Sequence, residues 1–379
     1  MVKFLVNERA NIEAWDSADN RNPLMLASEL GEESIATFLI EHGANVSVCN
    51  QVSRSTALIL AADNGNYNIV KILIHKDSNT IHTRDMYGNT ALHYASASGH
   101  VKCVSHLVSN INVNIRNNRQ ETPLLIECKN GQLTVIKFLH MNYVVDLSVC
   151  DSVGNTALHS AVLSGDSECV EYILNSDRSF INTTNKKKES PVILAAKNNQ
   201  KIIVKLLISY GANIHDLGKY RKTLLHLAVK TSDTMYVSYF LDKGININTR
   251  DNRGRTPLLD ASAYQKWNIV EFLLKKGADP QIPHYSGGSV FYYAVEYANS
   301  RCVSLLLNAG IDIDRKYDSE YTPILKAAYK GKFDMVKLLV HHGANLKACN
   351  KNGDSILHFA AEFGIAECVS FILNTDKHY

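Results

Sequence analysis

One stretch near the C-terminal end reads Tyr321-Thr322-Pro323-Ile324-Leu325-Lys326-Ala327-Ala328. Thr322 can begin a helix, because its side-chain oxygen accepts a hydrogen bond from a free backbone N–H of the first turn. Proline is tolerated directly after it, since the first helical N–H has no partner anyway. The stretch therefore predicts the start of a short helix with an apolar body.

The same pattern recurs along the chain. The position of Thr322, which we name the anchor, is Thr, Ser or Asn in all eleven copies, and successive anchors are 32 to 34 residues apart. A fixed period over the whole chain indicates one array of repeated units, with no linker and no second domain. The anchors are Asn22, Thr56, Thr90, Thr122, Thr156, Ser190, Thr223, Thr256, Ser289, Thr322 and Ser355.

Other positions of the repeat also have a physical meaning. Five residues after the anchor, ten of the eleven repeats have Ala, which lets two helices approach closely. Nine residues after it, seven repeats have Gly, the residue that ends a helix in the left-handed conformation. A second helix follows with apolar residues at helical spacing, as in residues 69–74. Two more glycine positions close the second helix and form a tight turn before the next anchor, so 18 of the 20 glycines belong to the repeat.

This order of turn, short helix, turn, longer helix and extended loop resembles the ankyrin repeat. The segments 321–328 and His342-Gly343-Ala344-Asn345-Leu346 carry the resemblance, which covers essentially the whole chain. It implies an all-α solenoid of stacked helix-turn-helix units with β-hairpin-like fingers. It also implies a concave face lined by the fingers and the first helices.

The two ends of the chain look like the middle of an array. Residues 1–6 correspond one by one to residues 335–340, so 1–17 is expected to be a partial repeat that opens inside a second helix. Residues 367–373 read like the internal segment 168–174. Terminal repeats need a polar outer face. We therefore expect residues 1–379 to be a single array from a longer chain, and a complete protein with frayed ends is the alternative.

Composition sets further limits. The 379 residues have a formal charge of +3 and contain no apolar run long enough to span a membrane. Residues 1–9 turn polar too early for a secretory signal. We expect a monomeric, cytoplasmic protein without a membrane span.

The residues that could carry chemistry fit structural roles. Cys103, Cys169, Cys302 and Cys368 share one position of the second helix, where a cysteine acts as a small core residue. His93, His159, His226 and His358 share the fourth anchor position, and the resemblance implies a structural hydrogen bond there. Residues 285–289 form a Gly-Ser run that coincides with a finger turn and is no phosphate-binding loop. We expect no catalytic residue, no metal and no cofactor, and hence no enzyme.

Basic residues gather in the middle of the array. Residues 178–276 contain eighteen Lys or Arg against seven Asp or Glu, a local charge of +11 that leaves −8 on the remainder. Many of these basic residues recur at the finger and first-helix positions that differ between repeats. They therefore predict a basic stripe that suits an acidic or phosphorylated partner. An ordinary solvated face is the alternative. The predicted residues are Arg119, Lys129, Lys186, Lys187, Lys197, Lys219, Lys222, Lys230, Arg253 and Arg255.

Further along the chain, the same variable positions become aromatic. Aromatic residues in recognition positions are typical of binding hot spots, although some could pack only between fingers. The predicted partner-binding residues are Tyr264, Tyr285, Tyr297, Tyr321, Tyr329 and Phe363.

Some repeats depart from the pattern. The glycine that ends the first helix is replaced by Asn199, Ser232, Gln265 and Ala298 in four consecutive repeats, and Glu127 replaces the small Ala in one. Loss of this glycine costs local stability. We expect repeats in the region 190–320 to open first.

The sequence favours a non-catalytic scaffold that binds another protein along the concave face. One alternative is a sensing or tethering segment of a larger channel or enzyme whose functional domain is absent here. A second alternative, disfavoured, is a nucleic-acid or phosphate binder that uses the basic stripe. The identity of the partner does not follow from these residues.

Overall fold

The computed structural model describes residues 10–17, 20–317, 320–364 and 366–376. Most of the predicted partial repeat at residues 1–17 lies outside the described residues. The chain forms two compact units, Met1–Asn213 and Ile214–Tyr379. The described residues contain 22 α-helices, three short 3₁₀ helices and two isolated β-bridges but no β-sheet, so the predicted all-α class is confirmed.

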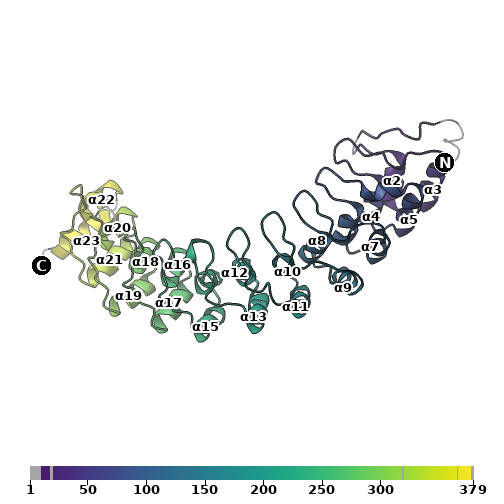
Figure 1. Cartoon of the computed structure of the whole chain (residues 1–379). Helices are drawn as coiled ribbons and strands as arrows, with labels where there is room; N and C mark the ends of the chain where they lie inside the picture. The colour runs from purple at the N-terminus through teal and green to yellow at the C-terminus, as the bar shows by residue number, and fades with distance from the viewer. Residues whose placement is uncertain (1–9, 18–19, 318–319, 365, 377–379) are drawn as a thin grey trace. The chain divides into compact units, whose positions relative to one another are not determined.

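The N-terminal unit consists of helix pairs in chain order. Figure 1 shows the first helices of this unit in one row, the second helices in another, and the finger loops extending beyond the first row. The first helices are α2 (Pro23–Leu30), α4 (Ala57–Asp63), α6 (Ala91–Ala97), α8 (Pro123–Asn130), α10 (Ala157–Ser164) and α12 (Pro191–Lys197). The second helices are α3 (Glu33–Glu41), α5 (Tyr67–Lys76), α7 (Val101–Leu107), α9 (Leu133–Asn142), α11 (Ser167–Ser176) and α13 (Lys201–Ser209), with a 3₁₀ turn at Ser78–His82.

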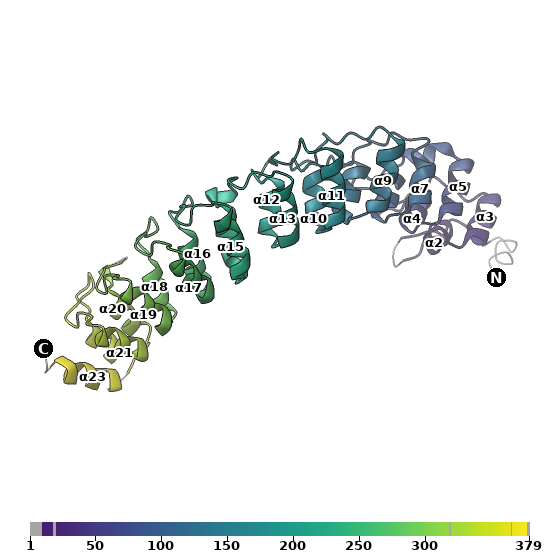
Figure 2. The same cartoon turned by 90° about the horizontal axis from the view of Figure 1, so that it is seen from below.

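The C-terminal unit repeats this plan. Its second helices lie side by side when the unit is seen from below (Figure 2). The first helices are α14 (Leu224–Ala228), α16 (Pro257–Ala263), α18 (Val290–Glu296), α20 (Pro323–Tyr329) and α22 (Ile356–Glu362). The second helices are α15 (Thr234–Asp242), α17 (Trp267–Lys275), α19 (Ser300–Asn308), α21 (Phe333–His341) and α23 (Ala366–Asp376), and 3₁₀ turns occupy Lys219–Arg221 and Val229–Thr231.

The anchors begin the first helices as the sequence predicts. The Thr256 hydroxyl accepts a hydrogen bond from the Leu259 N–H at 3.3 Å, and Pro257 occupies the first helical position. The other anchors whose side chain caps the helix are Asn22, Thr56, Thr122, Thr156, Thr223 and Ser289. The remaining anchors share the extended backbone of a helix-capping residue. Local sequence alone therefore sets where each first helix starts.

The ends of the first helices adopt the left-handed conformation whether or not the residue is glycine. Gly131 has φ of 70°, and Ala298 has φ of 56° at the equivalent position. All 18 glycines that the repeat accounts for have positive φ. The helix-ending position is thus determined by the fold, and a non-glycine residue there is strained.

The core lies between the two rows of helices. Ala61, Ala95 and Ala161 are fully buried at the small-residue position, where successive first helices pack against each other. The cysteines predicted to fill the core, Cys103, Cys169, Cys302 and Cys368, are also buried. Each helix pair therefore buries its apolar faces on its neighbours, as expected for a repeat array.

Candidate partner-binding surface

Each finger is a tight hairpin that hydrogen bonds to itself. The Asp151 N–H donates to the Asn155 carbonyl at 3.0 Å, and Asp151 Oδ1 accepts the N–H groups of Val153 and Asn155, both at 2.8 Å. Sequence analysis did not single out this position, although Asp or Asn five residues before the anchor is a visible signal. The residues that accept two backbone N–H groups in the same way are Asp85, Asn117, Asn185, Asp251 and Asn350.

Neighbouring fingers of the N-terminal unit are joined through their backbones. Ser152 N donates to the Arg119 carbonyl at 2.8 Å, and Lys186 N donates to the Val153 carbonyl at 2.9 Å. These bonds hold the tips at a fixed spacing. The side chains of Arg119, Lys186 and Lys187 are exposed there, so three predicted basic residues occupy the finger tips of this unit.

Two other predicted basic residues of this unit are ion-paired within their own repeat. Lys129 Nζ lies 2.9 Å from Glu121 Oε1, and Lys197 Nζ lies 2.7 Å from Glu189 Oε1. The glutamate side chains are only 10% and 5% exposed, whereas the lysines are about half exposed. Because a shielded carboxylate balances each ammonium group, Lys129 and Lys197 add little to the positive field of the surface.

The C-terminal unit neutralises two more of the predicted residues. The carboxylate of Asp260 is fully buried and pairs with Lys222, while Arg255 Nη1 lies 3.6 Å from Asp260 Oδ1. Lys222 Nζ also lies 3.8 Å from Asp251 Oδ2, and its side chain is 13% exposed. Lys222 and Arg255 thus belong to a buried charge network that joins a finger to α16. Sequence analysis missed Asp260, although an acidic residue at that helical position occurs in no other repeat.

The remaining basic residues of the C-terminal unit lie over tyrosine rings. Lys219 Nζ and the Arg253 guanidinium are 4.9 and 5.0 Å from the ring centroid of Tyr220, and Lys230 Nζ is 5.1 Å from that of Tyr264. All three basic side chains are exposed. A cation over a ring keeps its charge while losing freedom, so these groups are ordered donors at the surface.

Four aromatic rings on α20 and α22 and next to their ends form a contiguous cluster, which we name the C-terminal aromatic cluster: Tyr321, Tyr329, Phe359 and Phe363. The Tyr329 centroid lies 5.9 Å from Tyr321, 5.6 Å from Phe359 and 6.1 Å from Phe363. Phe359 is buried, whereas Tyr329 and Phe363 are 42% and 47% exposed. The buried ring, which sequence analysis missed, supports the exposed ones.

A second aromatic group lies on the preceding repeats. Tyr297 stacks on Tyr293 with a centroid distance of 6.4 Å and an interplanar angle of 9°, and Trp267 lies 6.4 Å from Tyr297. Tyr285, which is 70% exposed, lies under the Arg250 guanidinium at 5.0 Å. Each predicted aromatic residue in this group therefore has a partner that restricts it, and Tyr297 remains 41% exposed.

A charged bridge lies between the two aromatic groups. Glu296 Oε1 is 3.4 Å from Lys326 Nζ and 4.0 Å from Lys330 Nζ. Lys326 lies 4.8 Å above the Tyr292 ring, and Lys330 lies 5.8 Å from the Tyr329 ring. The resulting surface of α18, α20 and α22 is aromatic, and the charged groups of Glu296, Lys326 and Lys330 lie between its two aromatic groups.

The histidines at the fourth anchor position make the structural bonds that the resemblance implies. His226 Nε2 lies 3.0 Å from the Arg255 carbonyl, so this nitrogen carries the proton, and Nδ1 accepts from the Thr223 N–H at 3.2 Å. Burial lowers the pKa of His226, and it lowers the pKa of His93 to about 4. The imidazoles of His93, His159 and His226 therefore join consecutive repeats, whereas His358 is exposed and bonds Ser355 of its own repeat.

The cysteines of the chain fall into a buried and an exposed set. Burial raises the pKa of Cys169 and of Cys302 to about 12, which keeps both thiols protonated. Cys49, Cys150 and Cys349 are exposed. Within the described ranges, no group of three or more His, Cys, Asp or Glu side chains could hold a metal ion.

One buried carboxyl group stands out. Glu127 replaces the small residue of α8, and its side chain is fully buried beside the Ser96 hydroxyl. Desolvation raises the pKa of Glu127 to about 8. The side chain is therefore mostly protonated at neutral pH.

The sequence profile of ankyrin repeats in three copies matches five overlapping segments that cover residues 47–379, and that of the single ankyrin repeat matches residues 19–51. The chain belongs to the ankyrin repeat family. Within the described part of this ankyrin array, every helix is too short or too polar to cross a bilayer.

Curated relatives resemble only parts of the ankyrin array. It is 37% identical over 89 residues to an L-asparaginase of Dirofilaria immitis, which is 24% of this chain and 15% of that protein. It is 35% identical over 66 residues to Ankyrin repeat domain-containing protein 37 of Mus musculus, 17% of this chain and 42% of that protein. It is 27% identical over 124 residues to the Transient receptor potential cation channel subfamily A member 1 homolog of Caenorhabditis elegans, 33% of this chain and 10% of that protein. The array thus spans less than half the length of each of these relatives.

Proposed function

We propose that this chain is a non-catalytic scaffold that binds another protein through its fingers and first helices. The observation that carries the proposal is the exposure of Tyr297, Tyr329 and Phe363 at nearly equivalent positions of three consecutive repeats. Ankyrin repeats generally mediate protein–protein interaction. In this proposal all eleven anchors belong to one array that acts as a monomer in the cytoplasm.

The exposed aromatic rings of this surface are held in place by neighbouring rings. An exposed aromatic side chain leaves apolar area in water. Covering that area contributes about 25 cal/mol of binding free energy per Å². Rings that are already held by their neighbours lose little conformational freedom when a partner covers them. Tyr329 touches three other rings, which makes it the expected hot spot of the interface.

The basic finger tips indicate the chemistry of a second contact. Arg119, Lys186 and Lys187 are exposed at neighbouring tips, whereas the other two predicted residues of that unit are ion-paired. We propose that these three residues bind an acidic or phosphorylated segment of the partner. Arginine suits such a segment because its guanidinium can form two parallel hydrogen bonds with one carboxylate or phosphate.

The test is affinity capture with the full chain, followed by measurement of the dissociation constant for the protein recovered. The triple variant Y297A/Y329A/F363A should bind that protein at least about tenfold more weakly, as expected when a hot spot is truncated. The control is Met235→Ala, because Met235 is 78% exposed on the second helix α15. Equal binding by the triple variant would reject the aromatic surface as the interface.

Charge reversal tests the basic contact separately. The variant R119E/K186E/K187E should bind more weakly at low salt and lose much of the salt dependence of binding. The matched control is K129E/K197E, which reverses the two lysines that are paired with glutamates. If both variants weaken binding equally, the finger tips have no special role.

A second candidate function is that of a sensing or tethering segment in a larger protein. It is favoured by the partial matches to a cation channel and to an asparaginase, in which the matched segment is 10% and 15% of the protein. Full-length transcript sequencing tests it, because an open reading frame that continues into a channel or enzyme domain is expected. A stop codon in frame shortly upstream of Met1 and a stop after Tyr379 would contradict it.

A further inference from the structure

A pocket of about 510 Å³ lies on the second-helix side of the N-terminal unit, away from the fingers. Helix α5 forms its floor, and its outward stripe of residues at helical spacing includes Lys71, Ile72 and His75. His106 and Asn110, at the C-terminal part of α7 and just beyond it, form one wall. A volume of this size is in the range of small-molecule sites.

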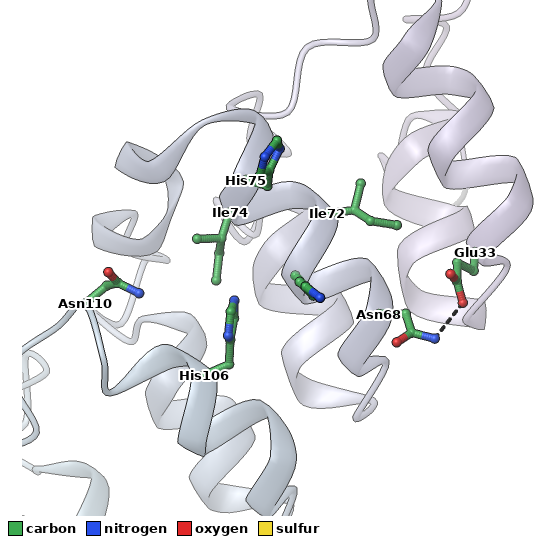
Figure 3. A pocket seen from close by; sticks show the side chains of 8 residues that line it. Glu33, Asn68, Ile72, Ile74, His75, His106 and Asn110 are labelled. Carbon is green, nitrogen blue, oxygen red and sulfur yellow. Dashed lines mark hydrogen bonds between the residues drawn. The ribbon is translucent and has the colours of Figure 1, made fainter.

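Three polar side chains of the pocket have no hydrogen-bond partner among the described residues. Figure 3 shows Ile74 of α5 and His106 of α7 facing each other, with His75 above them and Asn110 beside them. Among the described residues, the side chains of Lys71, His75 and Asn110 make no hydrogen bond or ion pair. An ammonium group, imidazoles and an amide therefore converge on one open volume without an internal acceptor.

The one carboxylate at the rim is already engaged. Glu33 Oε2 accepts a hydrogen bond from Asn68 Nδ2 at 2.7 Å, and this bond lies toward α3 (Figure 3). Glu33 thus forms the far edge of the pocket and carries a hydrogen bond of its own. Ile72, half buried, and Ile74, almost fully buried, supply an apolar surface between the donors.

We propose that this pocket binds a small amphipathic anion, a molecule with a carboxylate or phosphate head and a short apolar body. The head accepts hydrogen bonds from Lys71 and from the donors of α7, and the body covers Ile72 and Ile74. The occupant is a small molecule because 510 Å³ between helices is too confined for a folded partner. The site is separate from the finger surface, so this array would bind a ligand and a partner at the same time.

The test uses octanoate and octyl phosphate as anionic probes, and 1-octanol as the uncharged probe of equal chain length. Binding to the full chain is followed by methyl NMR of Ile72 and Ile74. At least one anion should shift both methyl signals in a saturable way, with a dissociation constant about tenfold lower than that of octanol. Losing a hydrogen bond to a charged group has an effect of this size.

Two variants locate the contact. Lys71→Gln should weaken binding of the anion about tenfold and leave octanol unchanged. The control is Lys137→Gln, because Lys137 occupies the same position of α9 outside the pocket. Absence of saturable binding by both anions, or equal binding by K71Q and the wild-type chain, would overturn the proposal. A preference between octanoate and octyl phosphate identifies the head group.

Discussion

The first five repeats and the four that follow end their first helices in the same conformation but with different residues. The first five use glycine, with φ between 70° and 80°, and the next four use Asn199, Ser232, Gln265 and Ala298, with φ between 56° and 60°. A residue with a Cβ pays a conformational cost of about 1–2 kcal/mol in this region. We therefore expect the two groups of repeats to differ in local stability although their helix ends share one conformation.

The glycine ends also permit a contact between repeats. Gln132 Nε2 donates to the Ala97 carbonyl at 3.2 Å, and the Gln132 side chain lies where a Cβ on Gly99 would stand. His100 lies over Gly65 in the same way and bonds the Asp63 carbonyl at 3.0 Å. In these repeats, the residue just before the second helix hydrogen bonds to a backbone carbonyl at the end of the first helix of the preceding repeat. Glycine at this position therefore both adopts the left-handed turn and leaves room for the side chain from the next repeat.

The largest expected effect is a difference in opening between the two regions. Four strained positions at about 1 kcal/mol each lower the local opening free energy of residues 190–320 by about 4 kcal/mol relative to residues 20–180. Native-state hydrogen exchange should show amides of α14, α16 and α18 exchanging before those of α4, α6 and α10. Best protection of the region 190–320 would refute this expectation.

The buried charge network is the second way to probe the weaker region. Asp260→Ala leaves Lys222 and Arg255 without their shared carboxylate, and we expect the unfolding free energy to fall by about 3 kcal/mol. Urea denaturation measures the loss. The control is Glu320→Ala, because Glu320 and Lys316 form a pair with side chains 60% and 56% exposed and should contribute less than about 1 kcal/mol. Similar losses in both variants would argue against a special role for the buried network.

Glu127 is an exception within the stronger region. Its folded-state pKa is raised from 4.5 to about 8, so the pH-dependent loss of stability is absent below pH 4.5 and grows as the pH rises toward 8. At pH 7 this loss is about 3 kcal/mol. Glu127→Ala, which restores the residue type of the other repeats, should raise stability at pH 7 and remove this slope.

The measurement is thermal or urea unfolding between pH 4.5 and 8.5. Glu127→Gln is the control, because it keeps the size of the side chain but cannot ionise, and it should also remove the slope. An unchanged slope in both variants would show that folding does not raise the pKa of Glu127.

The smallest expected effect comes from exchanging the helix-ending residues. Ala298→Gly should stabilise the chain by about 1 kcal/mol, because it relieves a positive φ. Gly99→Ala should destabilise it by about 1–2 kcal/mol, because it adds strain and displaces Gln132. Chemical denaturation measures the unfolding free energy of both variants. Changes of the same sign would contradict the expectation that glycine is the more stable residue at these helix ends.

The helix starts, the left-handed helix ends and the role of the histidines could be predicted from the sequence. The helix starts and ends depend on residues within a few positions or on a strict period, whereas the role of the histidines was implied by the ankyrin resemblance, and His226 also bonds the Arg255 carbonyl of the next repeat. The ring contacts of Tyr329 were not predictable in the same way. Phe359 belongs to the next repeat, and its contact depends on how closely α20 and α22 pack.

The sequence by itself determined the repeat, the class of fold and the positions available for recognition, because helix capping, turn conformation and apolar periodicity are local properties. Only the tertiary structure decided which of those positions keep a free charge. Lys222 and Asp260 are 38 residues apart, yet stacking of repeats brings them into a buried pair, whereas Lys187 remains exposed at a finger tip. The electrostatic surface thus depends on contacts between repeats, which no single repeat of the sequence contains.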